Sequence, residues 1–125
     1  MPIQPLLDAL TLAATMADIK PPLSAQEARV EATRCLYCFD APCIAACPTG
    51  IDVPAFIKKI ATDNLTGAAR TILEANVLGA SCARVCPTQV LCEGACVMLD
   101  LAKQPIEIGR LQRFATDAVT ERGID

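Results

Sequence analysis

Hydrophobic residues recur along this chain at the three- and four-residue intervals of helix faces. Phe56, Ile57 and Ile60 form one such face, and Asp52 and Pro54 just before them favour a helix start. Period-two alternation, the mark of a half-buried strand, is missing, and proline or glycine interrupts the valine-rich places. The pattern therefore predicts an all-α domain.

Two longer segments repeat the helical period. The first begins near Leu65 and is expected to end at Gly79. The second covers residues 105–119 and brings Gln112 to the edge of its apolar face, where a glutamine is usually a solvated boundary residue. We expect the apolar positions of both helices to pack into the core; they are Ala68, Ala69, Ile72, Leu73 and Val77 in the first helix and Leu111, Phe114, Ala115 and Ala118 in the second.

The first 23 residues are predicted to form an N-terminal arm. Pro21 and Pro22 end any helix that begins before them. We expect residues 1–23 to pack weakly or to serve as an interface, and residues 24–125 to form one helical domain with a modest core. The arm itself begins with an amphipathic pattern whose apolar positions are Leu6, Leu7, Leu10 and Ala14.

Two dense cysteine runs follow the arm. A capping-box pattern from Ser24 to Glu27 predicts a helix over residues 25–35, which leads into the first run. The runs are C-x2-C-x4-C-x3-C-P from residue 35 and C-x3-C-P-x4-C-x3-C from residue 82, and together they hold all 8 cysteines. Iron–sulfur clusters take soft thiolate ligands, and a proline after a ligating cysteine is typical of their loops. The runs therefore indicate a small electron carrier.

Charge and apolar pattern exclude several other classes of protein. The formal net charge is −3, with 11 basic and 14 acidic side chains in no block of like charge, and aromatic residues are few, so no nucleic-acid partner is expected. The most apolar run, residues 9–17, is too short to cross a bilayer, and the N-terminus lacks the features of a signal peptide. We therefore expect a cytoplasmic protein with no membrane partner.

Disulfides and zinc are the competing uses of the cysteines. Disulfides are rare in a reducing compartment. Zinc is the stronger of these two competitors, but the chain has no histidine and only one C-x2-C pair, Cys35 and Cys38, which favours iron–sulfur clusters over zinc. With no Trp, 1 Tyr and 3 Phe, the core must be largely Ala, Leu, Ile and Val, and we expect clusters to be needed for stable folding.

The first run resembles the two-cluster ferredoxin pattern C-x2-C-x2-C-x3-C-P with two extra residues between its second and third cysteines. The same logic directs Cys35, Cys38 and Cys43 to one cluster and Cys47 to a second one nearby. Two [4Fe–4S] clusters follow if every cysteine is a ligand, whereas a buried structural thiol is the alternative for any of them. Three pairs could each point from one side of a short helical turn: Cys43 and Cys47, Cys82 and Cys86, and Cys92 and Cys96.

Four pieces of the chain together resemble a known family. They are the first cysteine run, Cys82-Ala-Arg-Val-Cys86-Pro87, Leu91-Cys92-Glu93-Gly94-Ala95-Cys96 and Pro105-Ile-Glu-Ile-Gly-Arg-Leu-Gln112-Arg-Phe114. Over about residues 25–120 the chain is similar to the N-terminal dicluster domain of dihydropyrimidine dehydrogenase, including the small subunit of the bacterial NAD-dependent enzyme, and to that of the glutamate synthase small subunit. The resemblance implies an α-helical ferredoxin-like domain wrapped around two [4Fe–4S] clusters.

The resemblance also implies a ligand set for each cluster. It assigns Cys35, Cys38, Cys43 and Cys96 to the first cluster, and Cys47, Cys86, Cys92 and Gln112 to the second. Cys82 matches a family cysteine that is not a ligand. The glutamate synthase branch has an acidic residue at the position of Gln112, so this glutamine favours the dihydropyrimidine dehydrogenase branch.

The function that the resemblance implies is electron transfer inside a larger enzyme. Single electrons would pass between an FAD, which takes hydride from NAD(P)H on another domain or subunit, and an FMN-containing subunit that reduces uracil or thymine. No G-x-G-x-x-G fingerprint occurs in the chain, so it is not catalytically complete alone, and we expect an excised domain or else a free-standing subunit. The alternatives are the matching domain of a glutamate synthase small subunit-like oxidoreductase, and a module whose clusters, or zinc, only fold and dock a subunit.

Overall fold

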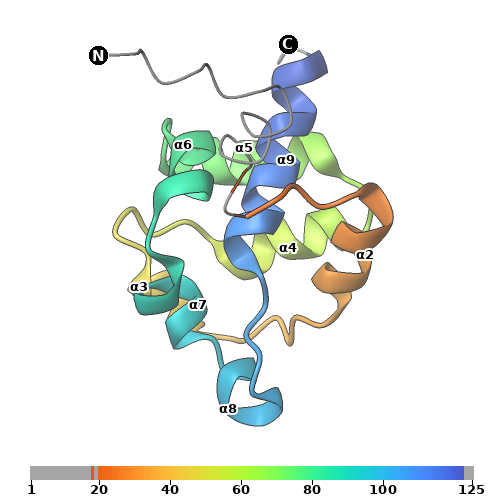
Figure 1. Ribbon diagram of the computed structural model, residues 1–125. Coiled ribbons are helices and arrows are strands. Elements are labelled where there is room, and N and C mark those ends of the chain that lie inside the picture. Colours follow the sequence, from red (N-terminus) through yellow and green to blue (C-terminus); the bar gives the residue numbers. More distant parts are fainter. Residues whose placement is uncertain (1–17, 19, 123–125) are drawn as a thin grey trace, which may run out of the picture.

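Helices make up the regular structure of the computed structural model, which describes residue 18 and residues 20–122 (Figure 1). No strand occurs in these residues, so the predicted all-α fold is confirmed. The predicted helix around Leu6, Leu7, Leu10 and Ala14 lies outside them. The helices are α2 (Ala25–Thr33), α3 (Pro42–Ala46), α4 (Val53–Ala61), α5 (Leu65–Ala75), α6 (Gly79–Val85), the 3₁₀ turn η1 (Thr88–Val90), α7 (Cys92–Ala95), α8 (Met98–Ala102) and α9 (Ile108–Arg122).

The core forms around α9, which runs through the middle of the molecule and packs against α2, α4, α5 and α6 (Figure 1). The predicted face of α4 is confirmed, since Phe56, Ile57 and Ile60 are all buried. On α9, Leu111 and Ala115 are buried as predicted. The rest of the buried core is aliphatic, as the composition predicts: Leu23, Ala28, Ala32, Ile51, Val53, Ala68, Ile72, Ile106 and Ile108.

Polar side chains cap the helices where the sequence predicts. At the start of α2 the Glu27 amide donates to the Ser24 hydroxyl at 3.2 Å, and the Ser24 amide donates back to the Glu27 carboxylate at 3.1 Å. These hydrogen bonds, the Ser24 backbone amide first, lower the pKa of Glu27. At α4 the Asp52 carboxylate accepts from the Ala55 amide at 3.3 Å. Both predicted helix starts are therefore confirmed.

The prediction that a helix from Leu65 ends at Gly79 is wrong. The α5 helix stops before Asn76, whose side-chain oxygen accepts from the Leu78 amide at 3.0 Å and turns the chain. Gly79 instead begins α6, where a Cβ on it would lie 2.5 Å from Cγ2 of Ile72. The glycine thus permits the close approach of α6 to α5. Val77, expected in the core, lies in the turn and is 84% exposed.

The described residues before α2 lie along α9. Arg113 forms an ion pair with Asp18 at 3.2 Å and donates to the Lys20 carbonyl at 3.2 Å, while Arg110 donates to the Pro21 carbonyl at 2.8 Å. These contacts bring the side chain of Lys20 across to η1. No helix in the described residues combines the length and the apolar character that a membrane crossing requires.

Candidate iron–sulfur sites

Two short helices, α3 and α7, pack against each other and place thiols in two separate cavities. Cys43 in α3 and Cys96 at the end of α7 line the first cavity, whereas Cys47 at the end of α3 and Cys92 in α7 line the second. The two members of each of these i,i+4 pairs therefore line different cavities. Each helix therefore links the two cavities. Helix α3 runs from the first cavity to the second, and α7 runs from the second to the first.

The first cavity encloses about 360 Å³ of space, including its open mouth. Its four thiols come from the loop after α2, from α3 and from the end of α7. Apolar side chains from α4, from α8, from the segment before α9 and from the start of α9 form much of its wall, while each of the four thiols stays partly exposed. The thiols are Cys35, Cys38, Cys43 and Cys96, and the walls include Val53, Ile57, Met98, Ile106 and Ile108.

The loop that carries Cys35 and Cys38 turns sharply through two left-handed residues. Tyr37 has a φ of 51° and Asp40 a φ of 48°, which is uncommon outside glycine and costs on the order of 1 kcal/mol or more for a bulky residue. Tyr37 is held there at both ends, because its amide donates to Cys35 Sγ at 3.4 Å and its hydroxyl to the Ala32 carbonyl at 3.1 Å. The turn brings both thiols of the loop to one cavity.

Burial suppresses ionisation of the thiols in the first cavity. It raises the pKa of Cys43 to about 11, and the neighbouring thiols of Cys35 and Cys96 add to the effect. Burial likewise raises the pKa of Cys35. Such thiols are protonated at neutral pH unless a cationic centre binds them, and binding releases the protons. Binding of a cluster at this site must therefore displace these protons.

The second cavity encloses about 470 Å³ of space, including its mouth, and brings together five candidate donors. Burial raises the pKa of Cys92 to about 12, with a further contribution from the adjacent Glu93 carboxylate. Burial also raises the pKa of Cys86, and the nearby thiols of Cys82 and Cys47 act in the same direction. The five donors are Cys47, Cys82, Cys86, Cys92 and Gln112.

Cys47 differs from the other thiols because the chain after it supplies hydrogen-bond donors. Burial acts to raise its pKa, but the Thr49 hydroxyl, 3.4 Å from Sγ, and the amides of Ile51, Thr49 and Gly50 outweigh burial and lower it. Gly50 has a φ of 66°, a conformation that folds these amides back towards the sulfur. The second cavity thus contains one thiol that is prepared for the thiolate form.

Gln112 is buried, although its position at the margin of the α9 face is typical of a solvated residue. It is 7% exposed, and its Nε2 donates to the Gly79 carbonyl at 2.7 Å. This hydrogen bond fixes the side-chain amide of Gln112, which lines the second cavity. The start of α6 therefore holds a neutral amide in the wall that the thiols share.

Cys82 also lines the second cavity and has its own polar partner. Asn76 donates from Nδ2 to Cys82 Sγ at 3.1 Å. Neither Asn76 nor Thr88, another residue of the wall, shows a distinctive pattern in the sequence, because the contacts of both depend on how the helices pack. The structure thus brings all nine donors of the two cysteine runs and α9 to the two cavities.

The donor sets fit iron–sulfur clusters. Each cavity is surrounded by at least three soft sulfur donors in an apolar wall, and such donors are what cluster irons take. Within residues 18 and 20–122, no three His, Cys, Asp or Glu side chains gather closely enough to hold a single metal ion. In each cavity the thiols line a volume larger than a single metal ion needs, as a multi-iron cluster requires.

Comparison with known proteins identifies relatives over nearly the whole chain. Residues 12–124 match the family described as dihydropyrimidine dehydrogenase domain II, 4Fe-4S cluster. The chain is 50% identical over 125 residues to the NAD-dependent dihydropyrimidine dehydrogenase subunit PreT of Escherichia coli O157:H7, and 47% identical to that of strain K12. It is 51% identical over 117 residues, 94% of the chain, to PreT of Salmonella typhimurium.

The chain spans 28% of the length of the Escherichia coli relatives and 26% of the Salmonella one. These matches confirm the branch that Gln112 favours in the sequence. The chain therefore belongs to the family of [4Fe–4S] domains described as dihydropyrimidine dehydrogenase domain II.

Proposed function

We propose that this domain carries single electrons through two [4Fe–4S] clusters, one in each cavity, within an NAD-dependent dihydropyrimidine dehydrogenase. The observation that carries the proposal is the partition of the donors: four thiols line one cavity, and four thiols with one buried amide line the other. In one cluster each thiolate holds one iron, so each cavity has enough donors for a complete cluster.

The ligand sets follow the partition, with one choice to make. Cys35, Cys38, Cys43 and Cys96 hold the first cluster. Cys47, Cys86, Cys92 and Gln112 hold the second. Gln112 is chosen over Cys82 because its Oε1 accepts no hydrogen bond from the described residues, whereas the Cys82 sulfur accepts one from Asn76. A neutral amide in place of a thiolate leaves one negative charge fewer beside the second cluster, which favours its reduced state.

The clusters, when bound, supply one-electron chemistry, and the chain controls their surroundings. Apolar side chains form much of the wall of the first cavity, while the Tyr37 amide and the loop after Cys47 donate hydrogen bonds to ligand sulfurs. Hydrogen bonds to the ligand sulfurs and the polarity of the surroundings both tune the reduction potential of a cluster. Because the two cavities differ in these features, we expect their clusters to have different reduction potentials.

The electron partners are proposed from the relatives. Their printed names describe a subunit of an NAD-dependent dihydropyrimidine dehydrogenase, and the chain covers about a quarter of each. We infer an FAD- and NAD(P)-binding domain or subunit on one side and an FMN-containing, pyrimidine-reducing subunit on the other. A cytoplasmic location suits eight cysteines that are all free thiols, because such a compartment keeps thiols reduced.

The test is anaerobic reconstitution with iron and sulfide, followed by metal and acid-labile sulfide counts. About eight irons and eight sulfides per chain are expected for two cubane clusters. Zinc without labile sulfide would refute the proposal. In the assembled enzyme, we expect NADH to reduce both clusters at least as fast as the enzyme turns over. Slower reduction would mean that the clusters serve only in folding and docking.

A further inference from the structure

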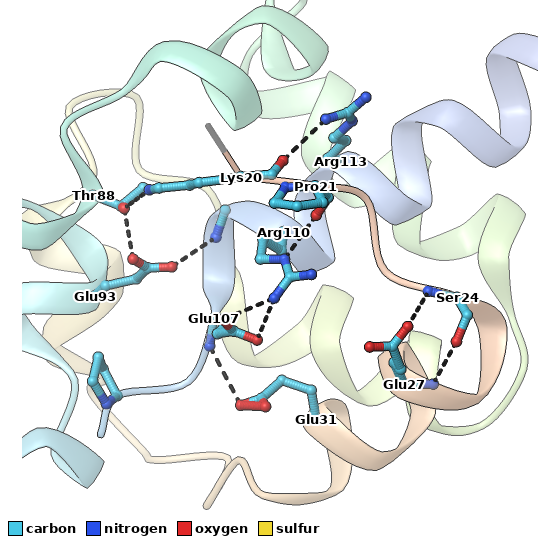
Figure 2. A network of polar contacts seen from close by, with 12 residues as sticks. Lys20, Pro21, Ser24, Glu27, Glu31, Thr88, Glu93, Glu107, Arg110 and Arg113 are labelled. Atoms are coloured by element: carbon cyan, nitrogen blue, oxygen red, sulfur yellow. Dashed lines mark hydrogen bonds and ion pairs between the residues drawn. The ribbon is translucent and has the colours of Figure 1, made fainter. Parts of the chain in front are cut away.

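The segment before α2 delivers a lysine to the wall of the second cavity. Arg113 donates to the Lys20 carbonyl at 3.2 Å and Arg110 to the Pro21 carbonyl at 2.8 Å, so the backbone is held to α9 at both residues. Figure 2 shows the Lys20 side chain extending from this segment to Thr88. The charge at its tip is therefore placed by the fold rather than left in solvent.

A continuous hydrogen-bond chain links this charge to the cavity wall (Figure 2). Lys20 Nζ donates to the Thr88 hydroxyl at 2.7 Å, and that hydroxyl donates to Glu93 Oε2 at 2.6 Å. The other carboxylate oxygen of Glu93 accepts from the Gly109 amide at 3.3 Å. Thr88 is 3% exposed and lines the second cavity, so every partner in the chain has a fixed place.

The two charges at the ends of this chain act on the second cavity in opposite directions. Glu93 directly follows the proposed ligand Cys92 in the chain, and the Lys20 ammonium is separated from the same carboxylate by the Thr88 hydroxyl alone. A carboxylate beside the cavity disfavours additional negative charge in it, and an ammonium favours such charge. No charged side chain lines the second cavity within the described residues, and Thr88 holds this pair of charges at its wall.

We propose that Lys20 raises the reduction potential of the second cluster by offsetting the Glu93 carboxylate across Thr88. This inference rests on the proposed function, because it requires a cluster in the second cavity. Reduction places one electron on the cluster and makes or breaks no bond to the chain, so a fixed positive charge nearby stabilises the product directly. Lys20 acts here through its charge and touches no cluster ligand.

The experiment is a potentiometric titration of the complete gene product, with dithionite as the reductant and EPR to follow each cluster. Lys20→Met keeps the length and apolar stem of the side chain but removes its charge. At a fixed applied potential, the reduced fraction of the second cluster is expected to fall severalfold while that of the first is unchanged. Lys20→Arg, which keeps the charge, is expected to restore the wild-type value.

A matched control separates charge from general effects. Lys103, an exposed lysine at the end of α8, carries the same charge, and α8 contributes Met98 to the wall of the first cavity. Lys103→Met is expected to leave the second cluster unchanged. An unchanged potential in Lys20→Met, or an equal fall in Lys20→Met and Lys20→Arg, would overturn the inference. Iron and sulfide counts on the unsubstituted protein test the proposed function separately, since a missing second cluster would appear there before any substitution.

Discussion

Gln112→Glu is the substitution that tests the role of the buried amide most sharply. Glutamate has the same length as glutamine, but it adds a negative charge and removes the donor that Gln112 provides to the Gly79 carbonyl at 2.7 Å. The new carboxylate faces the second cavity, where an added electron is then less stable. We expect the potential of the second cluster to fall and that of the first to stay the same.

The size of the fall follows from Coulomb's law. One charge at a ligand distance of about 4 Å from the added electron, in a medium of effective dielectric constant about 20, contributes about 4 kcal/mol. That energy corresponds to roughly 170 mV for a one-electron couple. Solvent at the mouth of the cavity screens part of it, so a shift on the order of 100 mV is expected.

The assay is a redox titration followed by EPR, with Gln104→Glu as the control. Gln104 is exposed, and its substitution adds the same charge at the surface before α9, where solvent screens it. Equal shifts in the two variants would show that the position of Gln112 has no special effect. An unchanged second cluster in Gln112→Glu, with both clusters still assembled, would refute the ligand role of this side chain.

Three further predictions concern the ligands and the fold. Cys82→Ala is expected to keep both clusters and Cys86→Ala to lose one, measured as iron and sulfide per chain; loss of a cluster in Cys82→Ala would make Cys82 the ligand. Phe56→Ala should cost about 3–5 kcal/mol in the free energy of unfolding of the loaded protein, because Phe56 is fully buried, whereas Phe39→Ala, at a side chain 94% exposed, should cost almost nothing; similar losses in denaturant titrations would contradict this. Ser24→Ala should cost about 1 kcal/mol through loss of the α2 cap, and an unchanged denaturation midpoint would show that the cap does not contribute.

Local sequence signals predicted much of the fold. The capping box of Ser24 and Glu27 fixed the start of α2, and the spacing of Phe56, Ile57 and Ile60 identified the buried face of α4. Both signals lie within one turn of the residues they describe. They depend on backbone geometry and side-chain chemistry that are the same in any helical protein.

Features that depend on packing between distant segments were not predictable in this way. Gly79 was expected to end a helix, but it begins α6, at a position where the neighbouring Ile72 leaves no room for a Cβ. Gln112 was expected at a boundary, yet the Gly79 carbonyl accepts its amide in the interior. The contact between Lys20 and Thr88, 68 residues apart, has no local signal at all.

The cysteine spacing gave part of the site and left part open. A count of eight thiols suggested two equal sets, and the ferredoxin-like pattern of the first run directed Cys43 to one cluster and Cys47 to the other, whereas the spacing of Cys92 and Cys96 did not divide that pair. In the structure, Cys43 and Cys47 line different cavities, as do Cys92 and Cys96. These pairs divide because α3 and α7 are so short that each begins at one cavity and ends at the other.

The division within α7 can be measured directly by comparing Cys92→Ala with Cys96→Ala. The two positions lie four residues apart on one short helix, yet they line different cavities. Each variant should retain about four irons per chain, and the EPR signal that remains should differ between them. The same remaining signal in both variants, or loss of both clusters from each, would contradict two separate clusters joined by α3 and α7.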